Sequence, residues 1–210
     1  MFYKKALAGL SVIAGATALL ISSYSPAMAQ GIPQGWFKVC AKQKTQDNKD
    51  VNVCNTMNNV MSESGQPLTM INLIEITGGE NQKRISVTVP TNRYIPAGIQ
   101  LQVGDGTYKK TLPYVVCVGA TCVAEDALDP ALIDAMKKGQ KLTVTTVNFQ
   151  GQVNPIDASL NGFTVAYTGP GMQKEAFEAE QRKMQEAVQS NRKEFEERMR
   201  AEQEKAKAGQ

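Results

Sequence analysis

Four cysteines are the residues of this sequence with the most direct chemistry: Cys40, Cys54, Cys117 and Cys122. They allow three pairings, and the geometry of neighbouring strands favours Cys40–Cys54 with Cys117–Cys122. In the chain-entropy description, closing these two loops stabilises the fold by about 3 and about 2 kcal/mol. The competing interpretation is a metal site or a redox dithiol. The second pair lacks the two-residue spacing of such centres, and a zinc site would need all four thiolates as ligands. We therefore expect two structural disulfides.

The absence of histidine removes most hydrolytic chemistry. With a histidine count of 0, the chain has no Ser-His-Asp triad, no Cys-His dyad and no HExxH zinc site. Nothing in the spacing of serines, lysines or carboxylates indicates another catalytic arrangement. Asp126, Asp129 and Asp134 match no EF-hand loop. We therefore predict a protein that is not an enzyme and that holds no cofactor and no metal.

The net charge gives no reason to expect a polyanionic partner. The chain has 23 Lys and Arg against 20 Asp and Glu, a formal charge of +3. Lys4 and Lys5 lie in a segment that we expect to be removed, which lowers the charge further. A charge this small predicts no nucleic-acid partner.

Residues 1–29 have the pattern of a cleaved signal peptide. Two lysines precede an apolar run over residues 6–21, and an Ala-x-Ala site ends at Ala29. The alternative, an uncleaved membrane helix, requires about 20 more strongly apolar residues. We therefore predict cleavage between Ala29 and Gln30 and no transmembrane span in the mature protein. The expected location is the periplasm, with association with the outer membrane or secretion as further destinations.

The segment from Trp36 to Tyr167 alternates apolar and polar residues with a period of two. Glycine and aspartate, as in Gly104-Asp105-Gly106, separate the alternating runs. Short strands at this spacing are typical of an antiparallel sandwich or barrel, so the expected fold class is mainly β. The expected strands are Trp36–Ala41, Val51–Met57, Met70–Thr77, Ile85–Val89, Ile99–Val103, Leu112–Val118, Leu142–Phe149 and Phe163–Tyr167.

One short helix is expected among the strands. Asp129 is suited to the N-cap and Pro130 to the first helical position. Apolar residues follow at helical spacing, and Gly139 ends the helix. A single helix between strands does not produce the alternation of a parallel α/β fold.

After Gly169-Pro170-Gly171 the composition changes, and residues 172–210 form a charged extension dominated by good helix formers. Its apolar side chains advance alternately by 7 and 4 residues, which places them on one narrow stripe of a helix. The stripe consists of Phe177, Met184, Val188, Phe195 and Met199.

Three interpretations of this extension remain open. The helix can be a solvated tail, it can dock on its own domain, or it can form a coiled coil with a second copy or bind a partner. The predicted domains are therefore a β-sandwich-like unit over residues 30–168 and an amphipathic helix over 172–210. Between them, Gly169-Pro170-Gly171 has the composition of a hinge.

Several motifs occur in a fixed order along residues 34–167. They are Gly35-Trp36, the pair Cys40 and Cys54, Ile99–Gly106 before Leu112-Pro113-Tyr114, the pair Cys117 and Cys122, and Ser159–Ala166. This ordered series resembles the invasion associated locus B family of exported proteins of Gram-negative bacteria. The charged extension from Met172 is not a usual feature of that family.

The resemblance implies a disulfide-stapled β-sandwich-like domain in the cell envelope, linked to host-cell invasion, and it carries over no catalytic residues. The leading hypothesis is a non-enzymatic envelope protein that binds another envelope or host protein, with the helix supplying oligomerisation or a second contact. The alternative is a periplasmic small-ligand or glycan-binding module. A cleft lined by exposed Trp36, Tyr94, Tyr108 and Tyr114 would favour that alternative.

Overall fold

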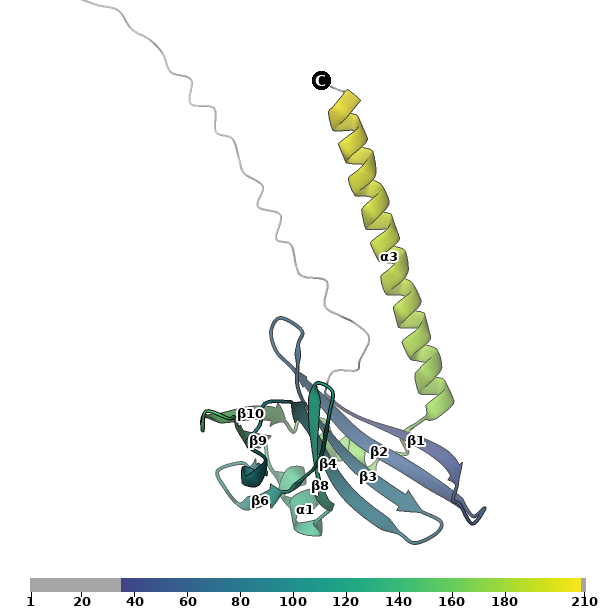
Figure 1. Ribbon diagram of the computed structural model, residues 1–210. Helices are drawn as coiled ribbons and strands as arrows, with labels where there is room; N and C mark the ends of the chain where they lie inside the picture. Colours follow the sequence, from purple (N-terminus) through teal and green to yellow (C-terminus); the bar gives the residue numbers. More distant parts are fainter. Residues whose placement is uncertain (1–34, 209–210) are drawn as a thin grey trace, which may run out of the picture.

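The computed structural model describes residues 35–208, so the predicted signal peptide and its cleavage site between Ala29 and Gln30 lie outside the described residues. The described chain forms two β-sheets with short helices beside them, and one long helix projects from this domain (Figure 1). The elements in chain order are β1 (Trp36–Lys44), β2 (Asp50–Met61), β3 (Pro67–Thr77), β4 (Gln82–Pro90), η1 (Ile95–Ala97), β5 (Ile99–Val103), β6 (Tyr108–Leu112), β7 (Tyr114–Val118), β8 (Thr121–Ala127), α1 (Pro130–Lys138), β9 (Lys141–Val147), β10 (Val153–Ser159), α2 (Phe163–Thr168), β11 (Met172–Gln173) and α3 (Lys174–Ala208).

The strands are distributed over a larger and a smaller sheet. The order in the seven-stranded sheet is β11-β1-β2-β3-β4-β8-β7, and the order in the four-stranded sheet is β10-β9-β5-β6. All pairs of named strands are antiparallel except β1 with β11. The predicted fold class is confirmed: the protein is mainly β, with two sheets, two disulfides, short helices and a long C-terminal helix.

The period-two pattern of the strands produces the core. Successive side chains of a strand point to opposite faces, so alternate residues such as Ile71 and Leu73 of β3 are fully buried. Leu101 of β5 and Val144 of β9 reach the same cluster from the smaller sheet. Complete burial of one such side chain contributes about 1.5–3 kcal/mol. The core is thus shared by both sheets and makes the two sheets one unit.

The helix α1 begins as its sequence predicts. Pro130 occupies its first turn, and Asp129 Oδ1 accepts a hydrogen bond of 2.8 Å from the backbone N–H of Ala131. The apolar face of α1 buries Leu132 and Met136 in the core. The prediction of this helix is confirmed.

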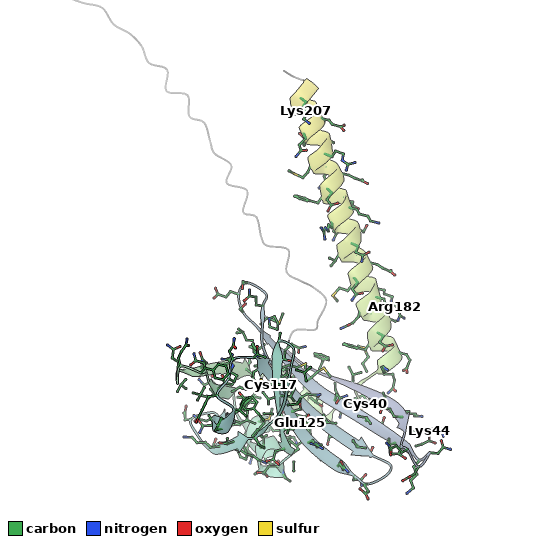
Figure 2. All side chains as sticks on the ribbon, in the orientation of Figure 1. Cys40, Lys44, Cys117, Glu125, Arg182 and Lys207 are labelled. Carbon is green, nitrogen blue, oxygen red and sulfur yellow. A yellow bond between two sulfur atoms is a disulfide. The ribbon has the colours of Figure 1, made fainter. Side chains whose placement is uncertain are left out.

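Both disulfides have the expected pairing. Cys40 of β1 lies opposite Cys54 of β2, and Cys117 of β7 lies opposite Cys122 of β8. Cys40 and Cys117 are labelled in Figure 2, on two different strands of the larger sheet. Each disulfide joins neighbouring strands, because the alternating segments around each pair fold into hairpins.

The segment Phe163–Tyr167 is not a strand, as its alternation suggested, but part of the helix α2. Gly162, with a φ of 79°, precedes the helix, and Gly169 follows it. In the helix, Phe163 and Tyr167 are one turn apart and stack with ring centroids 5.5 Å apart. Phe163 also meets Trp36 edge-to-face at 4.8 Å. These tertiary contacts outweigh the β propensity of the segment.

Two further differences concern the strands. The expected strand Leu112–Val118 is divided by Pro113 into β6 and β7, which belong to different sheets. A proline cannot donate to the ladder of a continuous strand, so the chain leaves one sheet there. The strands β8, β10 and β11, and all of β6 except Leu112, were not among the expected strands. In β10, Pro155 and Asp157 interrupt the apolar pattern.

Candidate interaction surface

The long helix α3 leaves most of its surface uncovered. Its side chains extend away from the helix along its whole length, including those of Arg182 and Lys207 (Figure 2). The predicted stripe of Phe177, Met184, Val188, Phe195 and Met199, called the α3 stripe below, lies on this helix. Val188, Phe195 and Met199 are 46%, 53% and 46% exposed. Within residues 35–208, no helix combines the length and the apolar character needed to cross a bilayer.

Ion pairs stabilise the flanks of α3 locally. Arg192 Nε lies 3.0 Å from Glu196 Oε1, and Arg198 Nη2 lies 3.6 Å from Glu194 Oε2. Pairs of this spacing contribute about 0.3–0.5 kcal/mol each. Because these charges pair along the sides of the helix, they leave the apolar stripe between them uncovered. A helix of 35 residues is about 52 Å long, so the stripe can make an extended contact.

The first turns of α3, in contrast, are attached to the domain. The Phe177 ring stacks on Phe37 of β1, with centroids 5.6 Å apart and an interplanar angle of 19°. Just before the helix, β11 pairs Met172 with Val39 and Gln173 with Cys40. Phe177, at the start of the α3 stripe, is therefore docked on the protein's own domain.

A partly buried ionic cluster holds the chain that leads into α3. Lys38 Nζ donates to the backbone carbonyls of Tyr167 at 2.8 Å and Gly169 at 3.2 Å. The carboxylate of Glu75 accepts from Tyr167 Oη at 2.9 Å and pairs with Lys83 Nζ at 2.7 Å. Lys38 itself lies 4.0 Å from Glu75. This cluster ties the C-terminal end of α2 to β1, β3 and β4. No sequence signal identified it, because its members are up to 131 positions apart.

The protonation states of the cluster follow from these contacts. Burial by itself raises the pKa of Glu75, but the hydrogen bonds from Lys83 and Tyr167 outweigh it and lower that pKa below its ordinary value. The hydrogen bond to Glu75 raises the pKa of Lys83. Burial, together with the hydrogen bond to Glu75, raises the pKa of Tyr167. Near neutral pH, Glu75 is thus charged and its two partners are protonated.

The segment Gly169-Pro170-Gly171 is packed against β1, whereas its composition suggested a free hinge. Gly171 has a φ of 75°, and a Cβ atom there would lie 2.9 Å from Cys40 Sγ and 3.0 Å from Lys38 Cγ. Only glycine fits both this conformation and this close approach. The disulfide at Cys40 is therefore part of the surface on which the base of α3 rests.

The aromatic residues of the ligand-binding alternative do not gather in one cleft. Trp36 is only 9% exposed, and its indole N–H donates to the carbonyl of Ser159 at 2.7 Å. Tyr108 donates to Asp129, and Tyr114 packs against the core, whereas Tyr94 is half-exposed. A cleft of about 740 Å³ lies between the C-terminal ends of β2 and β10, and Trp36 is its one aromatic lining residue. The stacking platform that the alternative requires is not formed.

In the part of the chain that the structure describes, no group of three or more His, Cys, Asp or Glu could hold a metal ion. Two of the three aspartates near α1 have structural partners. Asp126 pairs with Lys110 at 2.8 Å, and Asp129 caps α1. Asp134 lies on α1 itself.

The fold and its two hairpin disulfides define a stapled two-sheet β domain that carries a projecting helix. The family model described as Invasion associated locus B (IalB) protein matches residues 36–171, and the chain belongs to this family. The match ends directly before β11 and α3.

A solved structure gives a more distant likeness. The crystal structure of invasion associated protein B from Bartonella henselae is 17% identical and has a TM-score of 0.48. The alignment covers 60% of this chain and 87% of that one. No curated protein matches this chain.

Proposed function

We propose that this invasion-associated family member is a non-enzymatic, exported protein of the bacterial envelope and that it works by binding other proteins. Its β domain is a rigid support, and α3 is the arm that makes contact. The arm associates through the α3 stripe, first of all with the α3 helix of a second copy. The expected location is the periplasm, with attachment to the outer membrane or secretion as further destinations.

The observation that carries this proposal is the exposed α3 stripe. A helix in water gains most of its stability from burying an apolar face, and α3 buries only part of its first turns. Phe195 and Met199 are exposed and lie on the part of α3 that projects away from the β domain (Figure 1). An uncharged stripe between charged flanks is the pattern of helices that pair side by side. The 7-and-4 spacing favours a nearly straight pair over a strongly supercoiled one.

Export is supported by the chemistry of the cysteines. All four are in disulfides, and such bonds persist in oxidising compartments outside the cytosol. The pattern of residues 1–29 supports the same destination.

The association is tested by sedimentation velocity of the full-length mature protein over a range of concentrations. We expect an oligomer, and we expect the double change Phe195→Ser and Met199→Ser to remove the association that depends on α3, so that oligomers form only at much higher concentration. The matched control is Lys193→Ser with Glu197→Ser, which alters the opposite face of the same helix and keeps its net charge. A wild-type protein that stays monomeric at every concentration, or a control that dissociates it equally, would contradict the proposed pairing.

Export is tested separately by expressing residues 1–210 in a Gram-negative host and fractionating the cells. The protein should appear in the envelope fraction, and N-terminal sequencing should begin at Gln30. Recovery of an unprocessed chain from the cytosol would remove the basis for an envelope function.

A further inference from the structure

The two sheets end in four edge strands, and an unpaired edge is an open template for another strand. The edges of the larger sheet are β11 and β7, and those of the smaller sheet are β10 and β6. Proteins protect such edges by making them short, by covering them, or by placing lysine or proline in them. The composition of each edge therefore indicates whether it is meant to stay unpaired.

Three of the four edges are protected. β11 has only two residues and leads directly into α3. β6 carries Lys109 and Lys110, and β10 has Pro155 at its third position and a charged residue at its fifth. The part of β1 that β11 leaves uncovered carries Lys42 and Lys44. A strand added at these places would bury a charged side chain, or it would face a proline that has no backbone N–H to donate.

The fourth edge, β7, has no lysine, no proline and no further paired strand within residues 35–208. Its sequence is Tyr-Val-Val-Cys-Val, with no charge and no proline, yet Val115, Val116 and Val118 are 54%, 47% and 70% exposed. The strand has one irregularity, at Val115, and the pairing with β8 is regular from Val116 to Val118. The disulfide at Cys117 fixes this hairpin. An exposed apolar edge that is also rigid is suited to recognition.

The free edge offers hydrogen-bonding groups at a defined place. Cys117 and Cys122 lie opposite each other with their Cα atoms 4.0 Å apart. This short separation is typical of an antiparallel pair that does not exchange hydrogen bonds, so the N–H and C=O of Cys117 point away from β8. They are the groups that an added strand would meet first.

We propose that β7 pairs with β7 of a second copy, antiparallel about a two-fold axis at Cys117, and so joins two seven-stranded sheets into one. In this register Cys117 exchanges hydrogen bonds with Cys117 of the second copy. Val116 then lies opposite Val118 of the second copy, on the same face, and the two-fold axis repeats this apolar pair. The neighbouring copy can offer only β7, because its other edges in the described chain are protected. No like charges meet at the axis, which suits a self-complementary contact.

This surface is distinct from the α3 stripe, so each proposal can fail without the other. The contact is short and is therefore expected to be weak and concentration-dependent by itself. It adds a second place of self-association to the proposed function and does not depend on α3.

The test is photo-crosslinking from β7 in the full-length chain. Val116 is replaced by p-benzoylphenylalanine, and unlabelled and ¹⁵N-labelled copies are mixed and irradiated. We expect covalent dimers whose crosslinks map to residues 115–119 of the second copy. The yield should be unchanged when Phe195→Ser and Met199→Ser are added. Val118→Lys should lower it at least about fivefold, because each lysine would lie against the probe of the other copy.

The matched control carries the probe at Lys109 on the protected β6 edge and should give no covalent dimer. Near-UV circular dichroism checks that each variant keeps the native packing. No dimer from position 116, crosslinks that map to another element, or a dimer that Val118→Lys leaves unchanged would each overturn the β7 pairing.

Discussion

The β domain and the helix α3 are stabilised in different ways within one chain. In the domain, Ile71, Leu73 and Phe163 are completely buried in a core to which both sheets contribute. Along α3, none of the side chains described from Lys174 to Lys207 is fully buried, and ion pairs within the helix replace tertiary contacts. Changes in the domain should therefore alter the free energy of unfolding. Changes on the distal part of α3 should alter association instead.

The largest expected difference between the two regions is in the free energy of unfolding, when one aromatic residue of each is replaced by alanine. Phe163→Ala removes a fully buried ring that contacts Trp36 and Tyr167, and should lower the free energy of unfolding by about 3–5 kcal/mol. Phe195→Ala on α3 should change it by less than about 0.5 kcal/mol. Urea unfolding of both variants measures the difference. Similar losses would show that α3 is part of the same cooperative core.

The two disulfides should also differ from each other. Replacing Cys40 and Cys54 together by alanine should cost about 3 kcal/mol, because this bond closes the longer loop. Replacing Cys117 and Cys122 together by alanine should lower the free energy of unfolding by about 2 kcal/mol. This second bond lies in the β7–β8 hairpin, whereas the Cys40–Cys54 bond contacts the segment that leads into α3. Denaturant unfolding and non-reducing peptide mapping test both statements. Four free thiols in the native protein would refute the pairing.

The junction between the two regions is tested at Gly171. Gly171→Ala forces a Cβ atom against Cys40 Sγ, so it should cost about 1–3 kcal/mol and loosen the base of α3. The control is Gly65→Ala, which has a similar φ of 79° but open space around the added atom. Unfolding gives the energy, and small-angle scattering of the full chain gives the spread of α3 orientations. Equal behaviour of the two variants would contradict a fixed junction.

The smallest expected effect is a pH dependence from the ionic cluster below the junction. The folded-state pKa of Glu75 lies below its ordinary value of 4.5, so its stabilising contribution is present above that pH and is lost as the pH falls through the folded-state pKa. Glu75→Gln should therefore flatten the loss of stability on acidification. The control Glu186→Gln alters an exposed carboxylate of α3. Thermal unfolding from neutral to acidic pH compares the three proteins, and parallel curves for wild type and Glu75→Gln would exclude this role.

Much of this molecule is predictable because the relevant signals are local. Alternation with a period of two indicated most strands, and the cap at Asp129 with Pro130 located α1. The spacing of the cysteines, set against neighbouring strands, indicated the two disulfides that the structure contains. The stripe on α3 followed from the 7-and-4 spacing alone. In each case, the residues that form the pattern are close in the sequence.

Other features depend on contacts between distant segments, and only the tertiary structure decided them. The apolar alternation of Phe163–Tyr167 is compatible with a strand, but packing of Phe163 against Trp36 makes it a helix. The ionic cluster around Glu75 and the close packing of Gly171 against Cys40 involve residues that are far apart in the sequence, so no local pattern connects them. Which strand edge stays open was also undetermined, because the order of strands in a sheet is set by long-range pairing. Local periodicity determines which element a segment can form, whereas burial against distant partners determines which one it does form.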